Sequence, residues 1–293
     1  MEDDLNFDLT DIQSGIIPAA SFAHVSMRFV GVPQPLIPFV QSLWFLEGAK
    51  GNEQYFTEKL YPNASCSLTF QLDAAGCVVR ARQHYCLVRQ QWDASACYIG
   101  VVFKPGAFKS LFGLSPASES DDKLPFIPLR SHRFAHYDSL NTLCDTLENM
   151  DATLSPSVTC GRSALKQQVL MVKSWLLELI TNADTVSFKW QPLLNIANAQ
   201  LLSPAQLAKE CAMSRRTLER HMRKYFNVTP HQFFQYSQLR KARELLLSNH
   251  YTLSDIALAC AYYDQAHFTH VFSRSTFETP NHYRRRKLSQ IYN

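Results

Sequence analysis

The chain has 293 residues, 46% of them hydrophobic and 18% charged, which is typical of a soluble globular protein of about two domains. No apolar run reaches the roughly 18 residues of a membrane span, and the acidic Met1-Glu-Asp-Asp4 is unlike a signal peptide, so we expect a cytoplasmic protein without membrane contact. The net charge of +4 hides an asymmetry, because residues 187–293 hold 15 Lys and Arg against 6 Asp and Glu, whereas residues 1–186 hold 14 against 19. Only the C-terminal part is therefore expected to meet a polyanion.

The N-terminal part of the chain favours a β-rich domain. Residues 1–20 are acidic and polar, which is typical of a mobile arm. From about Phe22 to Phe103, short β-compatible runs such as residues 67–72 and 97–103 alternate with Pro, Gly and Asn. This pattern predicts a mostly antiparallel sheet or barrel.

Two helices are expected to flank this sheet, at about residues 139–150 and 163–180. The apolar residues of the second helix recur at spacings of three or four and form one face: Leu165, Val169, Val172, Leu176 and Leu179. Such a face is more often part of a core than of a subunit interface, although regulators also dimerise through one. We assign residues 1–181 to a regulatory or dimerisation domain and residues 182–186 to a linker.

The cysteines and histidines that could support catalysis do not form a recognisable site. The eight cysteines include no Cys-x-x-Cys pair and are interpreted as buried or semi-buried thiols. His24 and His84 stand alone, and His132 with His136 lies in a polar segment, so we predict neither a metal nor a cofactor. Six aromatic residues line either a pocket or, as we favour, an ordinary core: Trp44, Phe45, Phe70, Tyr85, Trp92 and Phe103.

Residues 187–293 contain one helical pattern twice, with the second copy about fifty residues after the first. Each copy has a short apolar helix, a tight turn, an amphipathic helix that begins at a capping residue, and a Thr-Pro that begins a further helix. The two copies occupy about residues 203–225 and 253–275. This is the outline of a helix-turn-helix in duplicate, which predicts an all-α C-terminal domain and an α+β chain.

The segment between the copies determines their spacing. From Thr229 to about Ser248 the apolar positions follow a helical period, and a helix of about 20 residues spans ~30 Å. That length approaches the ~34 Å repeat of B-DNA. One long helix can therefore hold two recognition helices in successive major-groove segments without dimerisation.

The amphipathic helix of the first copy is rich in arginine. Ser214 is its predicted cap, and Leu218 and Met222 face inward. Its outward ridge carries Arg215, Arg216, Glu219, Arg220 and Arg223. Arginines near the start of such a helix can bond guanine O6 and N7, and later ones reach phosphates. A solvated surface is the alternative, but the cap, turn and ridge together favour DNA contact.

The amphipathic helix of the second copy is much less basic. Asp264 is its predicted cap, and its core side carries Phe268, Val271 and Phe272. Its outward residues are Gln265, Ala266, Thr269 and His270. Gln265 can read adenine, and a methyl group of Ala266 or Thr269 can touch that of thymine. We expect this copy to contribute less affinity and the operator to be asymmetric.

Residues 187–286 resemble the AraC/XylS family of bacterial transcription regulators, most specifically in residues 255–272 and in Thr279-Pro280-Asn-His-Tyr283. The resemblance implies that base contacts are made by Arg216, Glu219, Arg220, Gln265, Ala266, Thr269 and His270. It implies phosphate contacts or simple solvation for Arg215, Arg223, Lys224 and residues 284–287.

Three turn positions depart from the family pattern, in which glycine is usual. They are held by Asn227, Ala261 and Phe277. Because Ala and Phe tolerate a left-handed conformation poorly, we expect the turns of the second copy to be reshaped. In the front half, residues 61–70 and 100–108 resemble the sensory domain of one AraC-family subset, which implies regulation and identifies no ligand.

Our main hypothesis is a sequence-specific DNA-binding regulator, not an enzyme, controlled through its N-terminal domain by a small-molecule effector or a protein. Its expected partners are a double-stranded DNA operator, RNA polymerase if it is an activator, and a second copy if it dimerises. A ligand-independent dimeric regulator is one alternative. The other is a DNA-repair or metal-dependent enzyme, for which Cys66 is the nearest reactive thiol although no local base or cation lowers its pKa.

Overall fold

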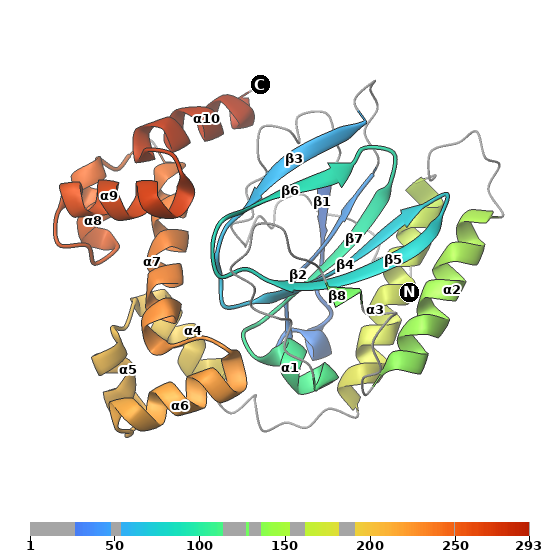
Figure 1. Cartoon of the computed structure of the whole chain (residues 1–293), viewed down its shortest axis with the longest axis horizontal. Coiled ribbons are helices and arrows are strands. Elements are labelled where there is room, and N and C mark those ends of the chain that lie inside the picture. The colour runs from blue at the N-terminus through green and yellow to red at the C-terminus, as the bar shows by residue number, and fades with distance from the viewer. Residues whose placement is uncertain are drawn as a thin grey trace.

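The structure is a computed structural model that describes residues 27–47, 54–113, 127–128, 136–152, 162–181, 191–248 and 250–292. It consists of an N-terminal β-sheet part flanked by helices and a C-terminal group of helices (Figure 1). The predicted α+β class is thus confirmed, while the arm predicted at residues 1–20 and the linker at 182–186 lie outside the described residues. Within the described part, none of the helices has both the length and the apolar character needed to cross a membrane.

The N-terminal part is built on antiparallel strands. These are β1 (Met27–Val30), β2 (Val40–Leu46), β3 (Tyr55–Leu60), β4 (Cys66–Asp73), β5 (Gly76–Gln83), β6 (Val88–Asp93), β7 (Cys97–Phe103) and β8 (Ile127–Pro128). One sheet has the order β1-β2-β7-β4-β5-β8, and β3 pairs with β6 in a second sheet. β5 alternates buried and half-buried residues because one of its faces is covered, whereas β7 is buried throughout because it has cover on both faces.

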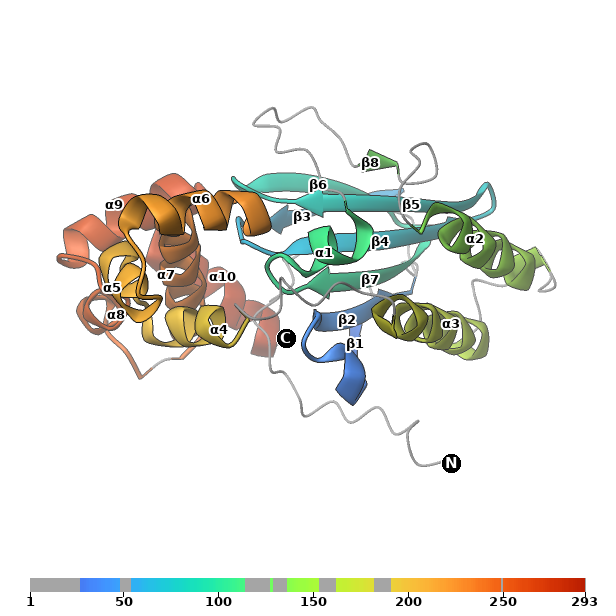
Figure 2. The ribbon, with the colours of Figure 1, turned by 90° about the horizontal axis from the view of Figure 1, so that it is seen from below.

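Helices cover the outer face of the larger sheet. They are α1 (Ala107–Phe112), α2 (Tyr137–Ala152) and α3 (Arg162–Thr181), together with the short 3-10 helix η3 (Gln34–Leu36). Figure 2 shows α2 and α3 side by side at one end of the sheet. Trp175 of α3 meets Phe70 of β4 edge-on at 6.2 Å. The predicted apolar face of α3, from Leu165 to Leu179, is buried in this core, so the core interpretation of that face is confirmed.

An aromatic cluster fills the space between the two sheets. Trp92 of β6 lies edge-on to Trp44 at 6.0 Å and to Tyr98 at 4.8 Å, and it stacks on Phe56 at 6.3 Å. Gly100 of β7 permits this packing, because a Cβ there would lie 2.0 Å from the Trp44 ring. The sheet therefore has a filled core on each of its faces.

The six aromatic residues considered as a pocket lining do not share one cavity. Phe45, Phe70 and Phe103 belong to the core under the helices. Trp44 and Trp92 belong to the cluster between the sheets, and Tyr85 packs against residues of the C-terminal part. The preferred interpretation, core packing for most of them, is confirmed.

The C-terminal part contains two similar helical units. The helices are α4 (Gln191–Gln200), α5 (Pro204–Glu210), α6 (Arg215–Phe226), α7 (Pro230–Leu246), α8 (Leu253–Ala259), α9 (Gln265–Thr276) and α10 (Pro280–Tyr292). The caps follow from short polar side chains that accept a backbone N–H three residues later. Ser214 caps α6, Thr229 caps α7 and Asp264 caps α9, as the sequence predicts.

Helix α7 connects the two units and is shorter than expected. It has 17 residues, which corresponds to ~25 Å at 1.5 Å per residue. Leu247 and Ser248 donate their backbone N–H groups to carbonyls three residues earlier, at 3.2 and 3.1 Å, so the chain tightens and leaves the α-helical ladder there. The predicted end near Ser248 is therefore two residues too late.

The turns of the second unit keep the geometry of the first. Ala212 and Ala261 follow the first helix of their units with φ of 51° and 56°, and Asn227 and Phe277 follow the second with φ of 58° and 54°. The expectation that Ala261 and Phe277 reshape these turns is wrong. Each residue adopts the left-handed conformation at a cost of about 1–2 kcal/mol, which the packing of the unit offsets.

Candidate DNA-binding interface

The first recognition helix, α6, presents charge outward and apolar groups inward. Leu218, Met222 and Phe226 are buried against α5 and α7. The five predicted contact residues are all exposed: Arg215, Arg216, Glu219, Arg220 and Arg223. Glu219 accepts hydrogen bonds from Arg223 at 3.0 and 3.1 Å, so these two side chains lie together along the helix. Arg216 and Arg220 stay next to one another on the open ridge, one turn apart.

The second recognition helix, α9, has a compact aromatic core beneath a weakly charged surface. Phe268 and Phe272 are fully buried, and Phe272 meets Tyr283 of α10 edge-on at 5.5 Å. Gln238 of α7 donates to the carbonyls of Cys260 and Ala261 at 2.9 and 3.1 Å and thereby fixes the turn before α9. The predicted contact residues of this helix are exposed or, for Thr269, half-buried: Gln265, Ala266, Thr269 and His270.

Both recognition helices lie on the same side of α7, and α4 and α10 lie on the other (Figures 1 and 2). The structure therefore places the two helices that carry the predicted contact residues on one side of the domain. The N-termini of α6 and α9 begin at the caps Ser214 and Asp264, where backbone N–H groups and exposed side chains are available to a polyanion.

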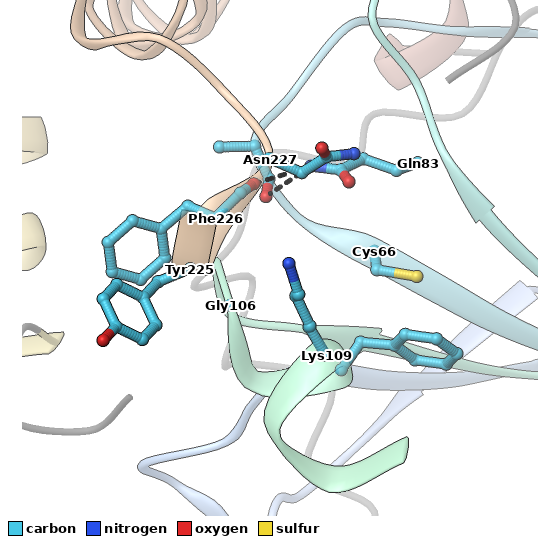
Figure 3. Close-up of a pocket in the computed structure, with 9 residues that line it drawn as sticks. Cys66, Gln83, Gly106, Lys109, Tyr225, Phe226 and Asn227 are labelled. Carbon is cyan, nitrogen blue, oxygen red and sulfur yellow. Dashed lines mark hydrogen bonds between the residues drawn. The ribbon is translucent and has the colours of Figure 1, made fainter. Parts of the chain in front are cut away.

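The N-terminal part touches the opposite end of each recognition helix, and we call these contacts the domain interface. On the first unit, Gln83 donates to the Phe226 carbonyl at 3.4 Å and Asn227 donates to the Tyr85 hydroxyl. Lys109 of α1 donates to the Lys224 carbonyl at 2.5 Å. Figure 3 shows Gln83, Lys109, Phe226 and Asn227 gathered at the turn after α6.

The second unit is held at the equivalent turn by an ionic cluster. Glu278, whose side chain is 4% exposed, lies 2.9 Å from Lys59 of β3 and 2.6 Å from Arg286 of α10. Burial by itself would raise the pKa of Glu278, but hydrogen bonds from Arg286, Lys59 and His282 outweigh burial and lower it to about 2. Lys59 also donates to the Thr276 carbonyl at 3.4 Å. The carboxylate thus remains charged and connects the two parts of the chain.

An aromatic and cationic stack continues this contact. The Arg243 guanidinium lies 3.5 Å from the centre of the Tyr61 ring and donates to the Tyr283 hydroxyl at 3.1 Å. Tyr61 lies edge-on to Tyr283 at 6.2 Å. The side chain of Tyr61, which directly follows β3, is therefore enclosed by residues of α7 and α10 that lie far along the chain.

The basic segment 284–287 is for the most part neither solvated nor available to phosphate. Arg286 is bound to Glu278, Arg284 donates to the Tyr251 carbonyl at 2.8 Å, and Lys287 is 1% exposed. Burial lowers the pKa of Lys287, which Glu58 opposes. Arg285 is exposed and Arg284 is half-buried, so the implication of a solvated or phosphate-binding tail is wrong for Arg286 and Lys287.

Two segments singled out in the front half of the sequence prove to be interface segments. Tyr61 begins one, and Gly106 belongs to the other. A Cβ at Gly106, which has φ of 80°, would lie 2.6 Å from the Phe226 ring. Nothing in the sequence pairs either residue with α6 or α10, because the contacts join residues more than a hundred positions apart.

Neither the Cys66 thiol nor the His84 imidazole is an activated group. Cys66 is buried, and burial raises the pKa of its thiol well above the ordinary value, the opposite of what a nucleophile needs. Burial lowers the pKa of His84 to about 3. Cys86 is exposed, contrary to the expectation of buried or semi-buried thiols, whereas Cys160 lies outside the described residues.

This geometry defines a class: a domain of two helix-turn-helix units on one connecting helix, with two recognition helices exposed on one side. A family model described as a helix-turn-helix domain matches residues 207–286, and one described as a domain of unknown function (DUF6597) matches residues 32–125. The C-terminal domain is an AraC-type helix-turn-helix domain, homologous to that of the transcription regulator RhaS.

Relatives of the chain include HTH-type transcriptional activators named RhaS. The protein of Klebsiella pneumoniae is 29% identical over 61% of this chain, and the match spans 65% of its own length. The protein of Citrobacter koseri is 27% identical over 69% of this chain and 73% of its own length. The chain is therefore homologous to transcription regulators of this family, and the homologous region reaches into the N-terminal part.

Solved structures similar to the C-terminal domain include an AraC-type regulator from Chromobacterium violaceum and the DNA-binding domain of AdpA in complex with a target DNA. The first is 28% identical and covers 34% of this chain and 95% of its own, with a TM-score of 0.30. The second is 25% identical and covers 32% and 87%, with a TM-score of 0.31.

Proposed function

We propose that the protein is a sequence-specific DNA-binding transcription regulator whose helices α6 and α9 enter successive major-groove segments of one operator. The observation that carries the proposal is the pair of capped recognition helices on one side of α7, with nine candidate contact residues exposed or half-buried on them. Arg216 and Arg220 are suited to guanine, Gln265 to adenine, and Ala266 and Thr269 to thymine methyl groups. His270 and the paired Glu219 would complete the base-facing surface, and Arg215 and Arg223 would contact phosphates.

The domain interface supports control of DNA binding by the N-terminal domain. That domain contacts the turn after α6 through Gln83 and the turn after α9 through Lys59. A small-molecule effector or a protein that moved these strands would change the relative position of the two units, and with it the fit to two groove segments. As an activator, the protein would also contact RNA polymerase, and it would act in the cytoplasm, where its operator is.

A ligand-independent dimeric regulator is the nearest rival. Its most obvious dimer surface, the apolar face of α3, is covered by the protein's own core from Leu165 to Leu179. A dimer would therefore have to use another surface, and a single chain already carries two recognition helices.

The test is a mobility-shift assay of the full chain against a set of genomic fragments at several salt concentrations. We expect a small subset of fragments to remain bound as salt rises, since base contacts add to the phosphate contribution. Equal binding to every fragment, with one steep salt dependence, would instead identify a nonspecific polyanion binder and refute the proposal. Footprinting of a bound fragment should show two protected segments about one helical turn apart.

A further inference from the structure

The first residue of α9 is held by a residue of α8. The Ser254 hydroxyl donates a hydrogen bond to Oε1 of Gln265 at 2.7 Å, although both side chains are exposed. The distance is ordinary for an O–H···O hydrogen bond, which here joins the two helices at the edge of the recognition surface. Gln265 is thus an exposed polar residue whose amide already has a defined partner.

Ser254 is itself on a well-fixed element. The capping box of α8 is complete, since Thr252 accepts the Asp255 N–H at 3.1 Å and Asp255 accepts the Thr252 N–H at 2.9 Å. Ile256 and Ala257 are buried in the core of the second unit. The hydroxyl of Ser254 is therefore presented from a rigid turn of helix and not from a mobile loop.

The hydrogen bond restrains the end of the Gln265 side chain beside α8, with Oε1 at the Ser254 hydroxyl. A glutamine reads adenine when Oε1 accepts from N6 and Nε2 donates to N7. The carbonyl oxygen has two lone pairs, so Oε1 can accept from Ser254 and from adenine together. The serine hydroxyl can also accept a hydrogen bond, so it fixes the position of the amide beside α8, and adenine itself decides which end of the amide faces which of its atoms.

The first unit lacks this arrangement. When the caps of α5 and α8 are aligned, Ala205 takes the position of Ser254. When the caps of α6 and α9 are aligned, Arg215 takes the position of Gln265. Alanine has no side-chain hydroxyl, so Ala205 cannot restrain Arg215 in this way. The arginine-rich unit gains affinity from charge, whereas the second unit gains discrimination from a side chain fixed before binding.

We propose that Ser254 is a positioning residue that sets the base preference of Gln265 for adenine in the second half-site. This inference rests on the proposed function, because it assumes that α9 enters the major groove. Ser254 need not touch the DNA. Its effect is to hold the Gln265 amide in place at the start of α9, so that less side-chain freedom is lost when the amide meets adenine.

The experiment selects bound DNA from a random pool with the full chain and then measures affinity for the selected site substituted at each base pair. Wild type should prefer adenine at one position of the site. Gln265→Ala should lose the preference at that position and bind all four bases there equally well. Ser254→Ala should lower the preference at that position alone by about fivefold, the size of one net hydrogen bond. Ser254→Thr retains the hydroxyl and should restore the preference.

Two controls separate positioning from stability. Ala205→Ser adds a hydroxyl at the matching place in the first unit and should leave every preference unchanged. Ser254→Ala combined with Gln265→Ala should be no worse than Gln265→Ala alone, because the two residues act as one unit. Thermal unfolding of Ser254→Ala should match that of wild type, which excludes a loss of folded protein.

The inference is overturned if Ser254→Ala keeps the wild-type preference, if it weakens all sequences equally, or if guanine is selected where Gln265 reads. Additive effects of the two alanine variants would also contradict it. A wild-type chain that selects no sequence at all would instead refute the proposed function, and the inference with it.

Discussion

The charge state of Glu278 gives the sharpest test of the domain interface. A pKa lowered from 4.5 to about 2 corresponds to about 3 kcal/mol of stability from the ionised carboxylate. Because the folded pKa lies below the unfolded one, this stability is fully present above pH 4.5 and is lost as pH falls toward 2. We expect about 1 kcal/mol to be lost by pH 4 and about 2 kcal/mol by pH 3.

The perturbation is Glu278→Gln, which keeps the shape of the side chain and removes its charge. Urea unfolding followed by far-UV circular dichroism should show a loss of about 3 kcal/mol at pH 7, and the difference from wild type should shrink between pH 5 and pH 3. The Lys59→Met variant isolates the contact between domains, since Arg286 and His282 still hold the carboxylate in it. A Glu278→Gln deficit that stays constant over this pH range would show that the ion cluster does not stabilise the fold, and the reasoning would fail.

Three further substitutions test other parts of the structure. Arg216→Ala should weaken discrimination at one base pair of the first half-site by about 1–3 kcal/mol in a competition assay, and a uniform loss across all sequences would assign Arg216 to phosphate instead. Phe277→Gly should raise the free energy of unfolding by about 0.5–1 kcal/mol, because glycine adopts the left-handed conformation without strain and the 69% exposed ring of Phe277 loses little packing. A lower free energy of unfolding in urea would mean that the ring stabilises the fold through its contacts. Gly106→Ala should separate the domains without unfolding either, because its Cβ would overlap the Phe226 ring. Limited proteolysis should then cut the chain between the domains faster than in wild type, and an unchanged digestion pattern would contradict the contact.

The sequence predicts those features that depend on neighbours in the chain. Ser214, Thr229 and Asp264 cap their helices because each cap bonds an N–H only three residues away. The inward positions Leu218 and Phe268 follow from helical period alone. Local chemistry is sufficient for such predictions, which is why the capping residues and the helical period locate both recognition helices.

The features that the sequence does not predict depend on contacts between distant residues. Lys59 and Glu278 are 219 positions apart, and neither belongs to a motif. Lys287 stands in a basic run that resembles a phosphate-binding tail, yet it is buried because α10 packs against the N-terminal part. The expectation for Phe277 fails for the same reason, since packing and the neighbouring Glu278 cluster hold a turn that a local preference disfavours.

The positions of the contacts indicate how an N-terminal domain could regulate without covering the DNA-binding surface. It meets α6 and α9 at their C-terminal turns, through Gln83 and Lys59, and leaves the N-terminal ends with Arg216 and Gln265 open. A change in the domain interface should affect the DNA affinity of the two units differently. The arginine-rich first unit retains charge attraction in any register, whereas the second unit depends on an oriented amide and needs its groove segment at the correct distance. A shift of the domain interface should therefore weaken the second half-site first and convert a two-site complex into one held by α6 alone.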